Sequence, residues 1–265
     1  MELEQIKEIW TLRPGDVAAE IAAWDSVAGD YVREAKNNFE TDPFLRFVSE
    51  KVRLDRNMSV LDVGCGAGAY AAALAERVGR VDGVDFSPEM VRLGREYAER
   101  NGLNNLHFLE RNWHTCDGSE FKGKYDLVFA HTTPAIMDYT TFMKLYKASR
   151  KYCFFSRPCR RTDEVLDQLR ALAGIESKTD ETMSYIFDIL WTLGACPEFD
   201  YSKVVWHSER KLEEAERWYL GRLKGSAEID EKTESRILGF LREIAVDGLV
   251  REQIHTTLVN VFWSV

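Results

Sequence analysis

Hydrophobic and polar positions along this chain switch repeatedly between two patterns, and the switching predicts strands that alternate with helices. Short apolar runs, typical of buried parallel strands, lie at 60–63, 81–84, 106–109, 125–130 and 152–156. Apolar residues at helical spacing, helix formers or helix start signals occupy 41–54, 71–74, 87–101 and 142–149. This order predicts an α/β fold built on a mostly parallel sheet.

The two ends of the chain depart from that order. Helices are predicted over 2–12 and 17–24, and later over 164–172, 183–194, 208–223 and 230–245. A sixth strand is predicted at 203–207, and the closing segment 256–265 alternates like a seventh. We therefore expect an N-terminal helical cap (1–40), a core made of 41–207 and 251–265, and a helical insertion at 208–250 before the last strand.

The stretch from Val60 to Ser87 predicts a specific chemistry. Its apolar strand ends in a turn with Gly64, Gly66 and Gly68, where bulkier residues would obstruct the backbone. The helix that follows directs its free N–H groups back at the turn. Asp85 ends the second strand, where a carboxylate can accept two hydrogen bonds from a ribose diol. The stretch therefore predicts a half-fold that binds a nucleoside, with a βαβ unit that binds no ligand as the plain alternative.

Two cofactors compete for this half-fold. Gly64, Gly66 and Ala69 satisfy the dinucleotide fingerprint G-x-G-x-x-G/A, and Asp85 follows at about the expected ~20-residue distance. Asp62, however, stands just before the turn. A carboxylate there would repel a pyrophosphate and would suit a cationic α-amine. This acid favours a cofactor with a cationic amine over a nicotinamide dinucleotide.

The pattern Asp62-x-Gly64-Cys65-Gly66-x-Gly68 resembles that of the class I S-adenosylmethionine-dependent methyltransferases, over roughly residues 24 to 160. The resemblance implies a Rossmann-like, seven-stranded, mostly parallel doubly wound sheet, with helices on both faces and an antiparallel last strand. It also implies S-adenosyl-L-methionine as the cofactor. The cofactor-binding residues that it implies are Tyr31, Asp62, Gly64, Cys65, Gly66, Gly68, Asp85, Phe86, Met90, Asn112, Trp113 and His131.

Three of these residues have a competing interpretation, and a fourth, Asn112, departs from the family's pattern. Tyr31 ends a W-x-x-x-A-x-x-Y pattern that resembles the segment before the family's core, and simple packing accounts for it equally well. Asn112 stands where the family commonly places an acid that binds the adenine amino group, and the neighbouring Trp113 is either an aromatic face for adenine or core. His131 ends the fourth strand as the candidate general base, or as a structural loop residue.

Composition narrows the partners. The chain has 265 residues and a net charge of -9, which argues against broad binding to nucleic acid. Its five cysteines contain no C-x-x-C pair, so we expect neither a zinc site nor a disulfide framework, and we expect a cytoplasmic protein. No apolar run approaches the ~20 residues of a membrane span. An arginine cluster, Arg157, Arg160 and Arg161, is either a site for an anionic substrate or a set of solvated or paired charges.

The resemblance therefore implies a methyltransferase that acts on a small molecule, by in-line transfer and without a metal. The Asn/Asp-Pro-Pro-aromatic motif of members that methylate amide-like or base nitrogens is absent at 131–136. Two alternatives stay open: an RNA methyltransferase, and a regulatory protein that binds S-adenosylmethionine without catalysis. The sequence is also compatible with a homodimer.

Overall fold

The computed structural model describes residues 1–12, 17–33, 37–176 and 180–265. The chain forms two compact units. Unit 1 comprises Met1–Arg157, Thr182–Asp200 and Val259–Val265, and unit 2 comprises Pro158–Glu181 and Tyr201–Leu258. Each unit is described by itself below.

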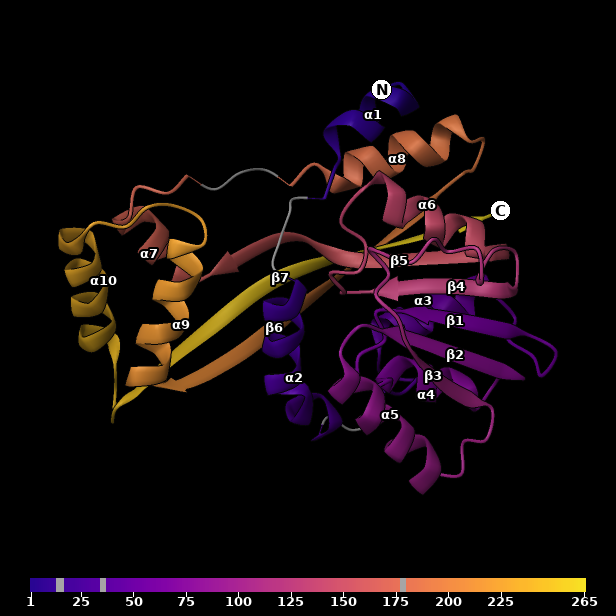
Figure 1. Ribbon diagram of the computed structural model, residues 1–265, viewed down its shortest axis with the longest axis horizontal. Helices are drawn as coiled ribbons and strands as arrows, with labels where there is room; N and C mark the ends of the chain where they lie inside the picture. Colours follow the sequence, from indigo (N-terminus) through magenta and orange to yellow (C-terminus); the bar gives the residue numbers. More distant parts are fainter. Residues whose placement is uncertain (13–16, 34–36, 177–179) are drawn as a thin grey trace. The chain divides into compact units, whose positions relative to one another are not determined.

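The chain builds one seven-stranded sheet in the order β3-β2-β1-β4-β5-β7-β6. Its strands are β1 (Ser59–Val63), β2 (Arg80–Asp85), β3 (Leu106–Glu110), β4 (Tyr125–His131), β5 (Ser149–Asp163), β6 (Glu198–Lys211) and β7 (Leu249–Ser264). β1 pairs in parallel with β2 and β4, β2 with β3, and β4 with β5. β7 runs antiparallel to its neighbour β5 (Figure 1). The predicted mostly parallel sheet with an antiparallel last strand is confirmed.

In unit 1, helices cover both faces of the sheet. They are α1 (Leu3–Ile9), α2 (Val17–Arg33), α3 (Pro43–Lys51), α4 (Ala69–Ala75), α5 (Pro88–Arg100), α6 (Tyr139–Ala148) and α8 (Thr182–Thr192). Neighbouring residues of β5 show the two layers, because successive side chains of a strand point to opposite faces. Phe154 packs 5.8 Å from Phe47 of α3, whereas Phe155 packs 6.4 Å from Phe142 of α6. The sheet is therefore doubly wound, as predicted.

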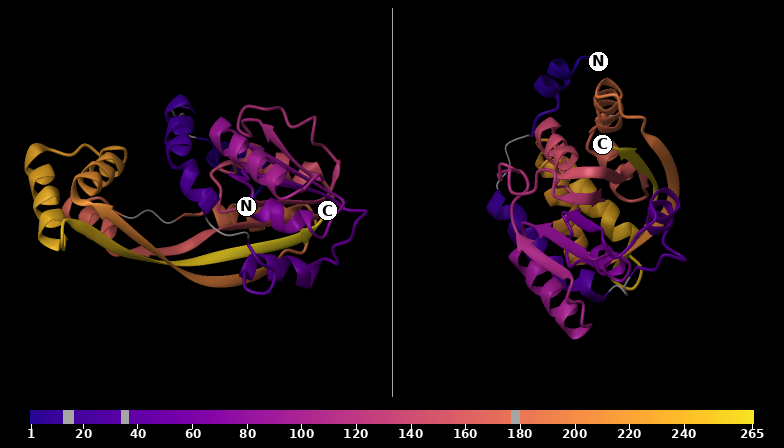
Figure 2. Two further views of the ribbon diagram at one scale, coloured as in Figure 1. Left: turned by 90° about the horizontal axis from the view of Figure 1, so that it is seen from below. Right: turned by 90° about the vertical axis from the view of Figure 1, so that its right-hand side faces the viewer.

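Unit 2 has its own core, formed by α7 (Leu166–Leu172), α9 (Leu212–Lys224) and α10 (Glu231–Ile244), which lie together in both figures (Figures 1 and 2). Leu169, Tyr219, Ile237 and Leu241 are buried in it. The helices predicted for 208–250 therefore pack together with a helix from earlier in the chain. No helix in the described ranges is long and apolar enough to cross a membrane.

The last three strands are longer than their predicted spans of 152–156, 203–207 and 256–265. The predicted helix start at Ser208 is wrong, because β6 continues to Lys211 and α9 begins at Leu212. The side chain of Glu209 pairs instead with Arg251 of β7 at 2.7 Å. Cross-strand partners thus override the local capping signal.

Strand β7 changes its burial pattern along its length. From Val250 to Thr256 the even-numbered residues are buried and the odd-numbered ones are exposed. From Leu258 to Trp263 every residue is buried. The first part is therefore covered on one face, and the second on both.

Candidate functional site

The turn between β1 and α4 is fixed by backbone hydrogen bonds to the neighbouring strand. The N–H groups of Gly64 and Cys65 donate to the carbonyl oxygen of Val84 at 2.8 and 3.0 Å. Gly64, Gly66 and Gly68 have φ angles of 71°, 52° and 85°. Because L-residues with a side chain rarely adopt such angles, glycine is required here by the backbone itself.

The three glycines differ in what surrounds them. A Cβ atom on Gly64 would lie 1.9 Å from Oγ1 of Thr133, and one on Gly68 would lie 2.4 Å from the ring of Phe108. A Cβ atom on Gly66 would meet only the sulfur of Met90, at 3.7 Å. Protein packing therefore requires Gly64 and Gly68, whereas Gly66 leaves room in which a ligand can approach the backbone.

Asp85 ties the end of β2 to this turn. Its carboxylate accepts hydrogen bonds from the N–H of Gly66 at 2.8 Å and from the N–H of Ser87 at 2.9 Å. Burial raises the pKa of Asp85, and these backbone bonds oppose the rise. Each carboxylate oxygen can accept more than one hydrogen bond, so Asp85 can also receive the hydroxyls of a ribose.

Asp62 is the second acid of the site and is only 3% exposed. Burial raises its pKa well above the ordinary value, and the nearby charge of Asp85 adds to the rise. No cationic side chain in the described part of the chain forms an ion pair with Asp62. A buried carboxylate of this kind gains most from a cationic ligand, since the ligand's charge would compensate for its burial. The α-amine of S-adenosylmethionine fits this requirement.

Cys65 packs inside the turn. Its sulfur lies near Gly83, where an added Cβ would come within 2.8 Å of it. Burial and the charge of Asp62 raise the pKa of the thiol well above its ordinary value. Cys65 therefore stays protonated and fills space in the turn, and it is not activated as a nucleophile.

The loop after β4 lies against the glycine turn through Thr133, as the close approach to Gly64 shows. The preceding Thr132 has a φ of 48°, an uncommon angle for a residue with a branched side chain. His131 ends β4, with its ring 4.6 Å from Phe44 and 4.2 Å from Tyr70. Burial lowers the pKa of His131 to about 3. The imidazole is therefore neutral near pH 7 and weakly basic.

The structure places the two predicted adenine contacts differently. The side-chain carbonyl of Asn112 accepts a hydrogen bond from the N–H of His114 at 2.9 Å, just beyond the end of β3. Trp113 is buried, and its Nε1–H donates to the carbonyl oxygen of Thr141 at 3.1 Å. Its ring lies 5.3 Å from that of Phe121. These contacts match the interpretation of Trp113 as core, and an adenine contact stays a prediction.

Phe86 and Met90 follow Asp85 directly. Phe86 is half-buried, and Met90 lies in the first turn of α5 with its sulfur facing the open side of Gly66. Both residues lie close to Asp85 in the chain, and Met90 also adjoins the turn. Their cofactor contacts stay predictions that the geometry permits.

Helix α2 carries Tyr31 and is attached beside the site by a residue that sequence reasoning missed. Asp25 accepts hydrogen bonds from the hydroxyl of Ser87 and, at 3.3 Å, from the N–H of Glu89. Tyr31 is 44% exposed and packs edge-on to Trp24 at 6.0 Å. No basic residue stands three or four positions from Asp25. An acid without a helical ion-pair partner was the available signal for a tertiary contact.

Comparison with known proteins agrees with this geometry. A family model described as a methyltransferase domain matches residues 54–199. Among solved structures, the fold is similar to that of a putative methyltransferase from Bacillus halodurans, with a TM-score of 0.52 and 13% identity, over 83% of this chain and 97% of that one. A SAM-dependent methyltransferase from Aquifex aeolicus has a TM-score of 0.50 and 20% identity, over 66% of this chain and 89% of that one.

Curated relatives match the chain over short segments. The 23S rRNA (uracil(1939)-C(5))-methyltransferase of Klebsiella pneumoniae is 47% identical over 53 residues, which are 20% of this chain and 12% of that protein. The ribosomal protein L11 methyltransferase of Dechloromonas aromatica is 41% identical over 83 residues, 29% of this chain and 26% of that protein. The chain thus spans about a quarter or less of these relatives. From the family match, the sheet order and the glycine turn with its two acids, we conclude that this chain belongs to the class I S-adenosylmethionine-dependent methyltransferases.

Proposed function

We propose that this enzyme transfers the methyl group of S-adenosylmethionine to a small-molecule acceptor by in-line displacement. The observation that carries the proposal is the attachment of the N-terminal helices of unit 1 beside the site. Asp25 of α2 caps α5 next to Asp85, and the carbonyl of Trp10, just after α1, accepts a hydrogen bond from the N–H of Tyr139 of α6 at 3.1 Å. Helices held near the carboxyl ends of the strands favour an enclosed acceptor site over an open one.

The roles of the residues follow from their surroundings. Asp62 would hold the cationic amine of the cofactor, Asp85 its ribose hydroxyls, and Gly66 the close backbone approach. The cofactor would supply an activated methyl group on a sulfonium. Its sulfur becomes a neutral thioether once the acceptor has taken the methyl group. The chain's own residues therefore have mainly to align the acceptor and to exclude water.

His131 would orient the acceptor as a neutral imidazole. Its pKa of about 3 makes it a weak general base. An acceptor atom that already carries a free lone pair or a negative charge needs no strong base. The proposal therefore favours thiolate, carboxylate or uncharged amine acceptors.

The net charge of -9 is unfavourable for an RNA substrate. The RNA and protein methyltransferases described above match this chain over 20% and 29% of its length, so they carry no information on its acceptor. Both substrate classes still belong in the test.

The experiment measures S-adenosylhomocysteine formation with small-molecule pools, total RNA and a protein extract. Asp62→Asn is the test variant. Asp82→Asn is a control matched for burial, since Asp82 is 3% exposed but binds Arg80 and Tyr125. Turnover with a small-molecule pool, lost only in Asp62→Asn, supports the proposal. Turnover with RNA or protein alone, or cofactor binding without any turnover, contradicts it.

A further inference from the structure

Unit 2 carries a group of arginine and tryptophan side chains that the methyltransferase site does not use. It comprises Arg161 of β5, Trp206 and Arg210 of β6, and Trp218 and Arg222 of α9, and we call it the arginine–tryptophan cluster. The guanidinium of Arg161 lies 5.7 Å from the ring centre of Trp206. Those of Arg210 and Arg222 lie 4.7 and 5.7 Å from the ring centre of Trp218.

Two acids near the cluster already have hydrogen-bond partners. Asp163 accepts from Arg161 at 3.0 Å and from the N–H of Leu166 at 3.1 Å. Glu252 accepts from the hydroxyl of Tyr219 at 2.7 Å and from two N–H groups at the start of α7. These carboxylates therefore hold Arg161, α7 and Tyr219 in place, and they form no ion pair with the α9 arginine.

Among the described residues, neither Arg210 nor Arg222 forms an ion pair with a carboxylate. Arg210 donates a hydrogen bond to the hydroxyl of Ser208. Arg222 forms no ion pair in the described ranges, and its guanidinium lies over the ring of Trp218. Desolvation and the like charge of Arg161 lower the pKa of Arg222, the charge of Asp163 partly opposes them, and the guanidinium stays protonated at neutral pH. An anion bound here would relieve this repulsion.

The tryptophans add two partly exposed aromatic rings. Trp206 is 37% exposed and Trp218 is 45% exposed. A tryptophan beside an arginine holds the planar guanidinium in place, and a fixed guanidinium loses less entropy on forming paired hydrogen bonds. Exposed tryptophan rings can also stack on a planar ligand. The cluster thus combines cationic forks with aromatic platforms.

We propose that the arginine–tryptophan cluster binds the phosphate group of a small aromatic phosphate ester, with Arg210 and Arg222 on the phosphate and Trp218 against the ring. The overall charge of -9 favours a small ligand over a polynucleotide. The proposal does not depend on the acceptor assigned to unit 1.

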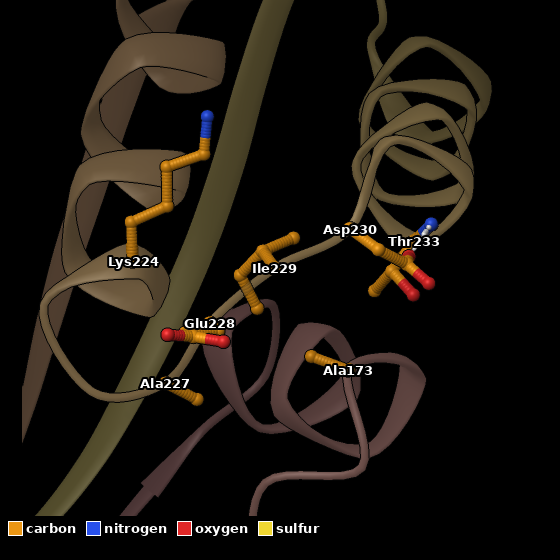
Figure 3. Close-up of a pocket in the computed structure, with 7 residues that line it drawn as sticks. All are labelled: Ala173, Lys224, Ala227, Glu228, Ile229, Asp230 and Thr233. Carbon is orange, nitrogen blue, oxygen red and sulfur yellow. Dashed lines mark hydrogen bonds between the residues drawn. The ribbon is translucent and has the colours of Figure 1, made fainter.

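Unit 2 also contains a hollow, but its charges make it a poorer phosphate-binding site than the arginine–tryptophan cluster. It is lined by Ala173, Lys224, Ala227, Glu228, Ile229, Asp230 and Thr233 (Figure 3). Its one cation, Lys224, pairs with Glu234 at 2.6 Å, and two of its other lining residues are acids. The hollow therefore has no free positive charge for a phosphate.

The test titrates phenyl phosphate into the full-length protein saturated with S-adenosylhomocysteine, which blocks the cofactor site. Binding is followed through the indole N–H signals in ¹⁵N NMR spectra, with Trp218→Phe to assign the Trp218 signal. Inorganic phosphate and phenol separate the contributions of the phosphate and of the ring. We expect saturable binding that shifts the Trp218 signal, with phenyl phosphate tighter than inorganic phosphate and phenol weakest.

The matched variants are Arg222→Gln and Arg217→Gln, two equal charge changes on the same helix, of which only the first lies in the cluster. Losing a charge-assisted contact should weaken binding roughly 10-fold to 100-fold in Arg222→Gln and leave Arg217→Gln unchanged. Arg222→Lys, which keeps the charge without the planar fork, should fall between them and controls for folding. Equal affinity in all variants, an absence of saturation, or binding of a single-stranded oligonucleotide but not phenyl phosphate would overturn the proposal.

Discussion

Separate replacement of Gly66 and Gly68 by alanine should distinguish their roles. We expect Gly66 to leave room for the ligand and Gly68 to leave room for packing. At Gly66 the new Cβ meets only Met90, at 3.7 Å, so the left-handed backbone angle of 52° is the main cost. That cost is about 1–2 kcal/mol of unfolding free energy. At Gly68 the same backbone cost is joined by a 2.4 Å approach to Phe108. The overlap raises the total to about 2–5 kcal/mol.

For cofactor binding the order should be reversed, with the larger loss in Gly66→Ala. A methyl group at position 66 occupies the space that the ligand needs, so we expect S-adenosylhomocysteine affinity to fall about tenfold or more. Gly68→Ala should lose less affinity but melt lower. For a chain of this size, 1 kcal/mol corresponds to about 2–4 °C in Tm. Calorimetric titration and thermal unfolding measure the two effects separately, and unchanged affinity in Gly66→Ala would refute the assignment of the turn as the cofactor cradle.

Three further substitutions test the site and the sheet that carries it. Because burial raises the pKa of Asp62, the native state holds that proton more tightly than the unfolded chain, and this group lowers stability as pH rises above its unfolded value of about 4. Asp62→Asn should therefore melt no lower than wild type at pH 7 and lose the rise in Tm that S-adenosylhomocysteine causes; a lower Tm with that rise intact would contradict us. Trp113→Phe loses the hydrogen bond to Thr141, so it should cost about 1 kcal/mol and leave cofactor affinity unchanged, whereas a several-fold loss of affinity would restore the adenine contact. Asp126 binds Arg150 at 2.7 Å, which lowers its pKa, so its contribution is present above pH 4 and is lost as pH falls. Urea unfolding of Asp126→Asn should show a loss of about 1–2 kcal/mol at pH 7 that shrinks towards pH 2.

The sequence predicted the sheet well where burial covers both faces. The runs at 60–63, 81–84 and 125–130 are strands in the structure, and apart from Asp62, Asp82 and Asp126 they are mostly apolar, as strands buried on both faces usually are. The glycine turn was equally predictable, since only glycine tolerates its three positive φ angles.

Contacts between distant segments were not predictable from local pattern. Ser208 carried a helix-start signal, but the pairing of Glu209 with Arg251 depends on which strands become neighbours. The attachment of Asp25 to Ser87 and the convergence of Arg161 with Arg222 likewise join residues about sixty positions apart. The charge and polarity of neighbouring residues do not indicate which distant residues will come into contact.

The change in burial along β7 has a consequence for sequence variation. Arg251, Gln253 and His255 face outward between buried neighbours, so this half of the strand should accept charged or polar substitutions at every second position. Between Leu258 and Trp263 that tolerance should disappear at every position. A saturation library scored for soluble protein should therefore divide this strand into two segments. In the first, every second position tolerates substitution, whereas in the second no position does, and the change should fall near Leu258.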